Sequence, residues 1–374
     1  FNIDAFYGNN STSGLNGLTY NLITMSGTTP NMLSVNVPVT VPSGYITGNN
    51  GAVVGGEGLT AMQRCDGSYW VFTTLRSSSG NFIVVYSLTS SGLSVINSGF
   101  QVPATPSPNE DFKSSIIISP NGNKLLYTNY SKLVTNDKKS YLFNFNKYTG
   151  IIDTPVELPV SYGASFSPDS NLLYMDSSFK IDESDGVYYI YQYDMNASDI
   201  INSRKIITHE YGVSGQMQIG SDGKIYIAHV GLNNLGIIHS PNNKCFEDNS
   251  NDCNYTFNGV GLNNTANAGL PNFIVAKSNT AFPTSTKISI TSTPQSCLSY
   301  KFFPNACGTA FNWEIKNSSA ATIFTTSGTQ ITYTFPSTGT YTVYLKDTSN
   351  VVLATRIITI TNPTPPVISG NIDI

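Results

Sequence analysis

Short apolar segments recur along the first 280 residues, each followed by a polar turn, and this pattern predicts β-strands rather than helices. The repeating unit is an apolar strand, a tight turn with Asn or Asp, an aromatic strand, a variable loop and a third strand. Copies lie at residues 59–100, 115–156, 163–208 and 216–260. A small meander of this kind cannot bury both of its faces alone, so repeats stack radially as the blades of a β-propeller.

The turns inside the copies carry the residues that a tight hairpin requires. They read Cys65-Asp66-Gly67-Ser68, Ser119-Pro120-Asn121-Gly122, Ser167-Pro168-Asp169-Ser170 and Gly220-Ser221-Asp222-Gly223. Gly, Asn and Asp tolerate the positive φ of two-residue hairpin loops. The segments 116–118 and 225–228 are too apolar for strands with one solvated face, so we expect both to be inner strands packed on both faces.

The two ends of this region supply strands for one further blade. Three candidate strands precede the first copy and one follows the fourth, at residues 2–7, 18–24, 32–39 and 270–276. Pairing the two ends would close residues 1–280 as a ring of about five blades and remove exposed edges. The alternative is that the ends 1–39 and 270–276 join blades outside this sequence, as part of a larger ring.

Strict alternation of apolar and polar residues begins at about residue 287. It predicts short strands at 287–292, 299–303, 310–316, 321–325, 330–335, 339–347 and 351–361. This spacing is typical of a β-sandwich, with Trp313 as its core aromatic and 341–345 as a central strand. Residues 363–374 form a Pro-rich linker and the start of a next module. The chain is therefore expected to be all-β. It begins at Phe1 without Met, so we expect either that a leader was removed or that the chain is a piece of a longer polypeptide, and the character of both ends favours the piece.

Charged residues make up only 11% of the chain, against about 25% in typical globular domains. The net charge of −4 is thinly spread, which excludes a nucleic-acid binder with a basic face. No apolar run is long enough for a membrane-spanning helix, so we expect no direct membrane insertion.

Four of the five cysteines form two pairs that are close in sequence: Cys245 with Cys253, and Cys297 with Cys307. Neither pair has the C-x-x-C spacing of a zinc site, so we predict two local disulfides in an exported protein. The alternative is free thiols in loops. The fifth, Cys65, is expected to pack as a small buried hydrophobe.

Catalytic and cofactor motifs are absent from the sequence, and no cofactor is expected. The three histidines, His209, His229 and His239, show no metal-site spacing. Asp248, Ser250 and Asp252 alternate like the start of a calcium loop, but the Gly and distal Glu of an EF-hand are missing, so a solvated loop is the preferred interpretation and calcium the weaker one.

Aromatic residues near loops are the remaining candidates for ligand contacts. Trp70, Tyr130 and Tyr162 are the predicted ligand-binding residues, and Tyr7 and Tyr45 are in similar positions. Packing between blades is the alternative, and the better expectation for most of them.

Two resemblances carry the functional expectation. Residues 14–276 resemble the propeller region of large surface and secreted proteins of Bacteroidota, which are exported by the type IX secretion system and are often linked to gliding adhesins. The matching segments are Gly17-Leu18-Thr19-Tyr20, 57–61 with 69–71, 167–174, 191–194, 218–228, 235–238, 253–255 and 269–273. Residues 283–362 are similar to PKD-type Ig-like modules through 311–314, 333–335 and 339–345. The usual Gly-Asp-Gly turn is replaced by Lys316-Asn317-Ser318-Ser319, so this module is divergent.

These resemblances imply a non-enzymatic protein of the outer cell surface, part of a large adhesin or filament. Its expected partners are other protein modules or copies of the same polypeptide, together with surface glycans. One alternative is a secreted enzyme acting on polysaccharide, which would need carboxylates such as Glu57, Glu110, Asp111 or Asp176 to converge on the channel. Another alternative is a filament subunit that donates a strand to its neighbour.

Overall fold

A computed structural model describes residues 2–3, 18–26, 29–39, 44–45, 55–64, 68–77, 79–89, 92–96, 99–102, 114–129, 139–147, 149–177, 187–245, 252–271, 288–304 and 311–361. In these ranges every regular element is a β-strand except one short 3-10 turn, Ile201–Ser203, which confirms the all-β class. The described part of the chain contains no helix that is long and apolar enough to cross a membrane. The chain divides into two compact units, Phe1–Asn279 and Thr280–Ile374.

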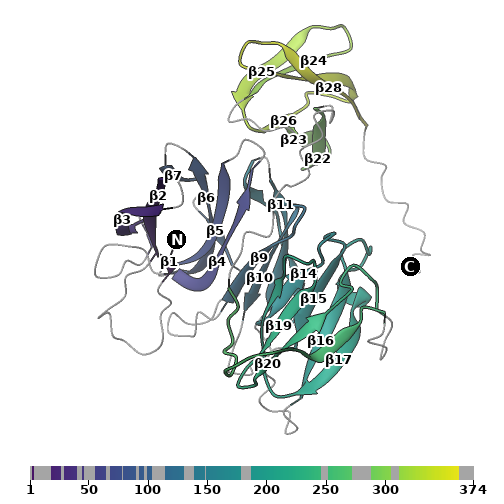
Figure 1. Cartoon of the computed structure of the whole chain (residues 1–374). Coiled ribbons are helices and arrows are strands. Elements are labelled where there is room, and N and C mark those ends of the chain that lie inside the picture. Colours follow the sequence, from purple (N-terminus) through teal and green to yellow (C-terminus); the bar gives the residue numbers. More distant parts are fainter. Residues whose placement is uncertain are drawn as a thin grey trace, which may run out of the picture. The chain divides into compact units, whose positions relative to one another are not determined.

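The first unit is a succession of antiparallel meanders (Figure 1). The N-terminal sheet holds β1 (Asn2–Ile3), β2 (Leu18–Ser26) and β3 (Thr29–Pro38). Sheet 1 holds β4 (Gly55–Gln63), β5 (Tyr69–Ser77), β6 (Gly80–Thr89), β7 (Gly92–Val95) and β8 (Phe100–Gln101). Sheet 2 holds β9 (Ser114–Ile118), β10 (Lys124–Asn129), β11 (Ser140–Asn146), β12 (Ile151–Ile152) and β13 (Val156–Leu158).

Two further meanders complete the described strands of this unit. Sheet 3 holds β14 (Ala164–Phe166), β15 (Leu172–Asp176), β16 (Val187–Asp194) and β17 (Lys205–Tyr211). Sheet 4 holds β18 (Ser214–Ile219), β19 (Ile225–His229), β20 (Asn234–Ile238) and β21 (Tyr255–Gly261). The first strand of each sheet lies next to the first strand of the following sheet, as in the blades of a propeller.

Successive side chains of a strand point to opposite faces of its sheet, and each face packs against a neighbouring sheet. In β10, Leu125 faces a core shared with Phe72 and Ile83 of sheet 1, whereas Leu126 faces a core shared with Leu173 of sheet 3. Tyr174 of sheet 3 packs in turn with residues of sheet 4 in a third core. Each middle sheet is therefore buried on both faces, which explains why β9 and β10 lack the polar alternation of a half-exposed strand.

Small residues let the first strands approach closely. An added Cβ on Gly163, which immediately precedes β14, would lie 2.0 Å from the carbonyl oxygen of Gly215 in β18. A Cβ on Gly215 would in turn lie 2.5 Å from the carbonyl oxygen of Ala268. A backbone carbonyl cannot move aside as the end of a side chain can, so these positions require glycine.

The N-terminal sheet packs on sheet 1 through Leu18 and Val39, which share a core with Val71 and Val84. The expected partner strand at 270–276 lies mostly outside the described residues, and Leu270 and Pro271 are not in a strand. The closure into about five blades therefore stays a prediction.

The second unit has two sheets on one hydrophobic core. One sheet has the order β22-β23-β26, from Ile290–Pro294, Ser299–Pro304 and Ile331–Thr334. The other has the order β25-β24-β27-β28, from Thr322–Gly328, Phe311–Lys316, Gly339–Lys346 and Val352–Ile360. Trp313 is almost fully buried in this core and donates its indole N–H to the carbonyl of Gly328 at 2.9 Å.

We predict that Gly163→Ala destabilises the first unit by about 1–3 kcal/mol, because the new methyl group forces apart two inner strands. Differential scanning calorimetry, which resolves the transitions of separate units, measures the change. Gly261→Ala is the matched control, since a Cβ there meets nothing within 4 Å. Equal shifts for the two variants would contradict the close approach of β14 and β18.

Candidate functional site

The first strands of sheets 1 to 4 line a narrow central cavity. Its described walls come from Gly58 and Leu59 of β4, 115–117 of β9, Ala164 of β14, and 216–218 of β18. Its volume is about 40 Å³, and a neighbouring cavity between the same strands is of similar size. Since one water needs roughly 10–15 Å³, each cavity has room for a few waters rather than a sugar ring. Among the described residues lining the two cavities there is no carboxylate, histidine or cysteine.

The tight turns of sheets 2 and 3 are built by the same hydrogen bonds. In the turn before β15, Ser167 donates its hydroxyl to Asp169 Oδ1 at 2.6 Å and accepts from the Leu172 amide at 2.9 Å. In the turn before β10, Ser119 donates to Asn121 Oδ1 at 2.8 Å and accepts from the Lys124 amide at 2.9 Å. The recurring Ser-Pro-Asn/Asp sequence therefore builds a side-chain frame for each turn.

These turns also bind one another from sheet to sheet. The amide of Asn121 donates to the Ser170 hydroxyl at 3.0 Å, and the amide of Asp169 donates to Asn242 Oδ1 at 3.1 Å. Asn196 extends the chain of contacts by donating its side-chain amide to Asn171 Oδ1 at 3.0 Å. The turns thus form a polar rim that runs from sheet 2 across sheet 3 to sheet 4.

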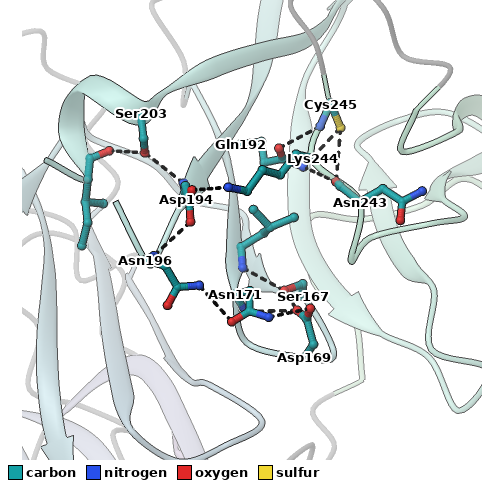
Figure 2. A network of polar contacts seen from close by, with 12 residues as sticks. Ser167, Asp169, Asn171, Gln192, Asp194, Asn196, Ser203, Asn243, Lys244 and Cys245 are labelled. Atoms are coloured by element: carbon teal, nitrogen blue, oxygen red, sulfur yellow. Dashed lines mark hydrogen bonds and ion pairs between the residues drawn. The ribbon is translucent and has the colours of Figure 1, made fainter. Parts of the chain in front are cut away.

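Gln192 of β16 lies next to this rim and connects sheets 3 and 4 (Figure 2). Its buried amide donates to the carbonyl of Asn243 at 2.9 Å and to the Tyr174 hydroxyl at 2.8 Å. Its carbonyl oxygen accepts the backbone amide of Cys245 at 3.0 Å. Cys245 is bonded to Cys253, so Gln192 holds a disulfide-closed loop of sheet 4 against sheet 3.

The carboxylates of the rim are bound by the chain's own donors. Asp194 accepts from Lys244 Nζ at 2.6 Å and from the Asn196 amide at 3.0 Å, and the hydrogen bond from Lys244 lowers the pKa of Asp194. Burial acts to raise the pKa of Asp169, but hydrogen bonds from Ser167 and Asn171 outweigh it and hold that pKa below its usual value. Both groups are thus stabilised as carboxylates, which suits a fixed scaffold rather than a proton donor.

Of the three predicted ligand-binding aromatic residues, the structure places Trp70 between two sheets. Trp70 is 2% exposed, packs edge-on against Phe145 of sheet 2, and donates its indole N–H to the carbonyl of Lys147 at 2.7 Å. It therefore joins two sheets instead of facing a ligand. Tyr162 is partly buried beside Thr128, and Tyr130 lies outside the described residues.

The predicted disulfide between Cys245 and Cys253 is confirmed. Cys297 is instead an exposed free cysteine, in the turn between β22 and β23, and its predicted partner Cys307 lies outside the described residues. The predicted disulfide between Cys297 and Cys307 is therefore not formed in this structure, because the thiol of Cys297 lies in solvent without a bonded partner. Cys65 also lies outside the described residues.

Of the three weak calcium candidates, Asp252 lies within the described residues. Asp248 and Ser250 lie outside the described residues, and Asp252 accepts the side-chain amide of Asn243 through its backbone carbonyl at 2.9 Å. Within the described ranges no three His, Cys, Asp or Glu side chains gather as a metal site.

His229 of β19 is a buried polar residue that sequence spacing did not single out. Its Nδ1 lies 2.6 Å from Asn234 Oδ1, which can only accept, so Nδ1 carries the proton. Its ring is buried against Phe257, and its Nε2 has no hydrogen-bond partner in the described part of the chain. Burial lowers the pKa of His229, although the bond with Asn234 acts in the opposite direction. The neutral ring therefore belongs to the packing of sheet 4.

No protein-family model and no curated protein matches this chain. Solved structures resemble it at low identity. One is PorZ, an essential surface component of the type IX secretion system of Porphyromonas gingivalis, at 12% identity and a TM-score of 0.37. The alignment covers 88% of this chain and 48% of PorZ, so the chain spans about half of its length.

Two other similar structures have names that denote enzymes. A putative 6-phosphogluconolactonase of Bacteroides fragilis is 12% identical, with a TM-score of 0.32 and coverage of 88% of this chain and 90% of that protein. An oligogalacturonate lyase of Vibrio parahaemolyticus is 9% identical, with a TM-score of 0.33 and coverage of 83% and 68%. Similarity at this level assigns no activity to the chain.

We predict that Gln192→Leu lowers the stability of the first unit by about 1–3 kcal/mol, because it leaves the buried amide of Cys245 without its acceptor. Calorimetry of the oxidised protein measures the loss. Gln101→Leu is the matched control: Gln101 is exposed on β8, and water can replace the exposed hydrogen bond that its side chain donates to the carbonyl of Ser79, so stability should change by no more than about 0.5 kcal/mol. A Gln192 variant as stable as the wild-type protein would refute the role of Gln192 as a clamp.

Proposed function

We propose that this chain is a non-enzymatic module of a large extracellular adhesin or filament at the outer cell surface. In this proposal the first unit is a propeller of about five blades, or part of a larger ring, that binds and assembles. The second unit is a divergent PKD-type, Ig-like spacer. Export by the type IX secretion system and a role in gliding or adhesion belong to the same proposal.

The observation that carries the proposal is an exposed apolar hairpin in the N-terminal sheet. Ile23, Met32, Leu33 and Val35 are between 50% and 59% exposed on β2 and β3. Soluble proteins rarely gather large apolar side chains in this way unless another molecule covers them. Among the described strands β3 pairs only with β2, so its outer edge has backbone groups available for a further strand.

A second copy of the chain is the occupant that we propose for this edge. The strand Thr29–Pro38 contains no charged residue, so two copies can meet there without charge repulsion. Antiparallel pairing of β3 with its own copy is isologous, meaning that the same surface serves both molecules. Backbone hydrogen bonds then supply affinity, and the exposed apolar side chains supply burial.

The disulfide supports the extracellular setting. Disulfides persist in oxidising compartments and are rare in the cytosol. The backbone amide of Cys245, which is bonded to Cys253, donates a hydrogen bond to the Gln192 side chain. The low content of charged residues agrees with a long-lived surface assembly whose partners are not steered by charge.

The alternative enzyme needs two or three carboxylates around the channel. Asp176 is the candidate whose side chain the structure describes. It is buried, and its two oxygens accept from the Ser161 hydroxyl and from the amides of Tyr162 and Gly163, at 2.9 to 3.0 Å. These bonds fix the segment that leads into β14, so the Asp176 carboxylate has a structural role.

Sedimentation velocity over a range of concentrations tests the assembly proposal. We expect the wild-type chain to form dimers as its concentration rises, and Val35→Lys to weaken this association by at least tenfold, because a charge enters the apolar edge. Ile201→Lys is the matched control, since Ile201 is 47% exposed on a different element. A wild-type chain that stays monomeric, or equal association of both variants, would overturn the proposal. Turnover of an acidic polysaccharide by the wild-type chain would favour the enzyme instead.

A further inference from the structure

A second surface of the first unit has the features of a binding site. Tyr189 and Tyr191 are two positions apart on β16, so both side chains project from the same face of sheet 3. His209 of β17 stands directly opposite Tyr189. The rings of Tyr189 and Tyr191 are nearly parallel, at 11° and 6.1 Å between centroids, and the ring of His209 lies 6.2 Å from Tyr189.

Arg204 extends this row at its other end. The register of β16 and β17 shifts between Ile190 and Tyr191, and Arg204 lies directly after the 3-10 turn Ile201–Ser203, where the chain enters β17. Its guanidinium carbon is 4.9 Å from the centroid of the Tyr191 ring. The four side chains, His209, Tyr189, Tyr191 and Arg204, therefore form one continuous strip, which we call the aromatic row.

The row is open to solvent at both ends. Arg204 and His209 are exposed, and the two tyrosines between them are partly exposed. Tyr191 packs at the margin of the core shared by sheets 2 and 3, and the outer strands of sheet 2 are only two and three residues long. In the described part of the chain Arg204 makes no ion pair.

We propose that the aromatic row binds an acidic polysaccharide. Tyrosine rings offer flat apolar faces with a polar edge, which suit the C–H faces and hydroxyls of sugar rings. Arg204 offers a planar guanidinium that can bind a sugar carboxylate through two parallel hydrogen bonds. Arg204, an exposed cation at one end of the row, gives the charge complementarity for a polymer that carries a carboxylate.

A single-stranded nucleic acid would use similar groups, but the charges of the chain disfavour it. Nucleic-acid affinity depends on many phosphate contacts from Lys and Arg. The chain has 19 Lys and Arg against 23 Asp and Glu, and Arg204 is the guanidinium of the row. A uronic-acid polysaccharide fits better, because a single sugar carboxylate matches the Arg204 guanidinium and no series of phosphate contacts is needed.

The inference deepens the proposed function by naming a class of partner, and it rests on the extracellular setting of that proposal. It uses a different surface from the β3 edge. Loss of polysaccharide binding therefore leaves the self-association test unchanged, and a monomeric chain leaves the polysaccharide test unchanged.

Affinity electrophoresis of the full chain in gels containing alginate, a polyuronate, tests the row, with dextran as the neutral polymer. We expect the wild-type chain to be retarded by alginate. Tyr189→Ala and Arg204→Gln should each weaken alginate binding by about tenfold or more, because each removes one of the two contacts. Tyr189→Phe keeps the ring and should retain most of the binding.

The matched control is Tyr344→Ala in the second unit, where Lys316 Nζ lies 5.4 Å from the Tyr344 ring. It removes a similar cation–tyrosine pair and should leave alginate binding unchanged. Cross-strand aromatic pairs also stabilise sheets, so calorimetry checks that each variant is folded. Absence of retardation by alginate, equal loss in the control, or stronger binding of an oligothymidylate than of alginate would overturn the proposal.

Discussion

Burial of both faces of every middle sheet is the constraint on which the first unit depends. A four-stranded meander has two apolar faces, and neither can remain in water. Leu125 and Leu126, adjacent on β10, satisfy this by packing into two different cores. The close approach of the first strands follows, since stacked sheets converge at their inner edge and leave space only for residues such as Gly163 and Gly215.

The same constraint explains where polar chemistry can lie. The two cavities that the described inner strands line have room for a few waters each, and the described polar networks lie at the turns between strands. There the Ser170 hydroxyl accepts the backbone amide of Asn121, and Asn242 Oδ1 accepts the backbone amide of Asp169. The hydrogen bonds of the rim therefore fix neighbouring sheets to one another. The two surfaces that we propose for other molecules are the apolar edge of β3 and the aromatic row of β16 and β17.

The strand pattern was largely predictable from the sequence because it depends on local features. Turn residues such as Ser167-Pro168-Asp169-Ser170 and apolar runs such as 116–118 identify hairpins and inner strands without tertiary information. The strands β22 to β28 accordingly lie within a few residues of the predicted positions. The disulfide between Cys245 and Cys253 was also predictable, since the two cysteines are close in sequence, at a separation of 8.

The side-chain roles were less predictable because they depend on which sheets meet. Trp70 lies near a turn in sequence, but the neighbouring sheet covers it, so proximity to a loop did not imply exposure. Gln192 and His229 gave no signal, because a single polar residue in a strand does not show which loop or ring it will contact. The aromatic row depends on a register shift and a cross-strand pair, which spacing along one strand does not reveal.

Hydrogen–deuterium exchange of the first unit tests the stacking of sheets most directly. If burial of both faces holds the sheets together, the backbone amides of β9, β14 and β18 exchange only on global unfolding, and they share one free energy of opening. The amides on the outer edge of β3 should exchange at least about 100-fold faster. Inner strands that exchange as fast as β3, or that open sheet by sheet with separate free energies, would contradict the account.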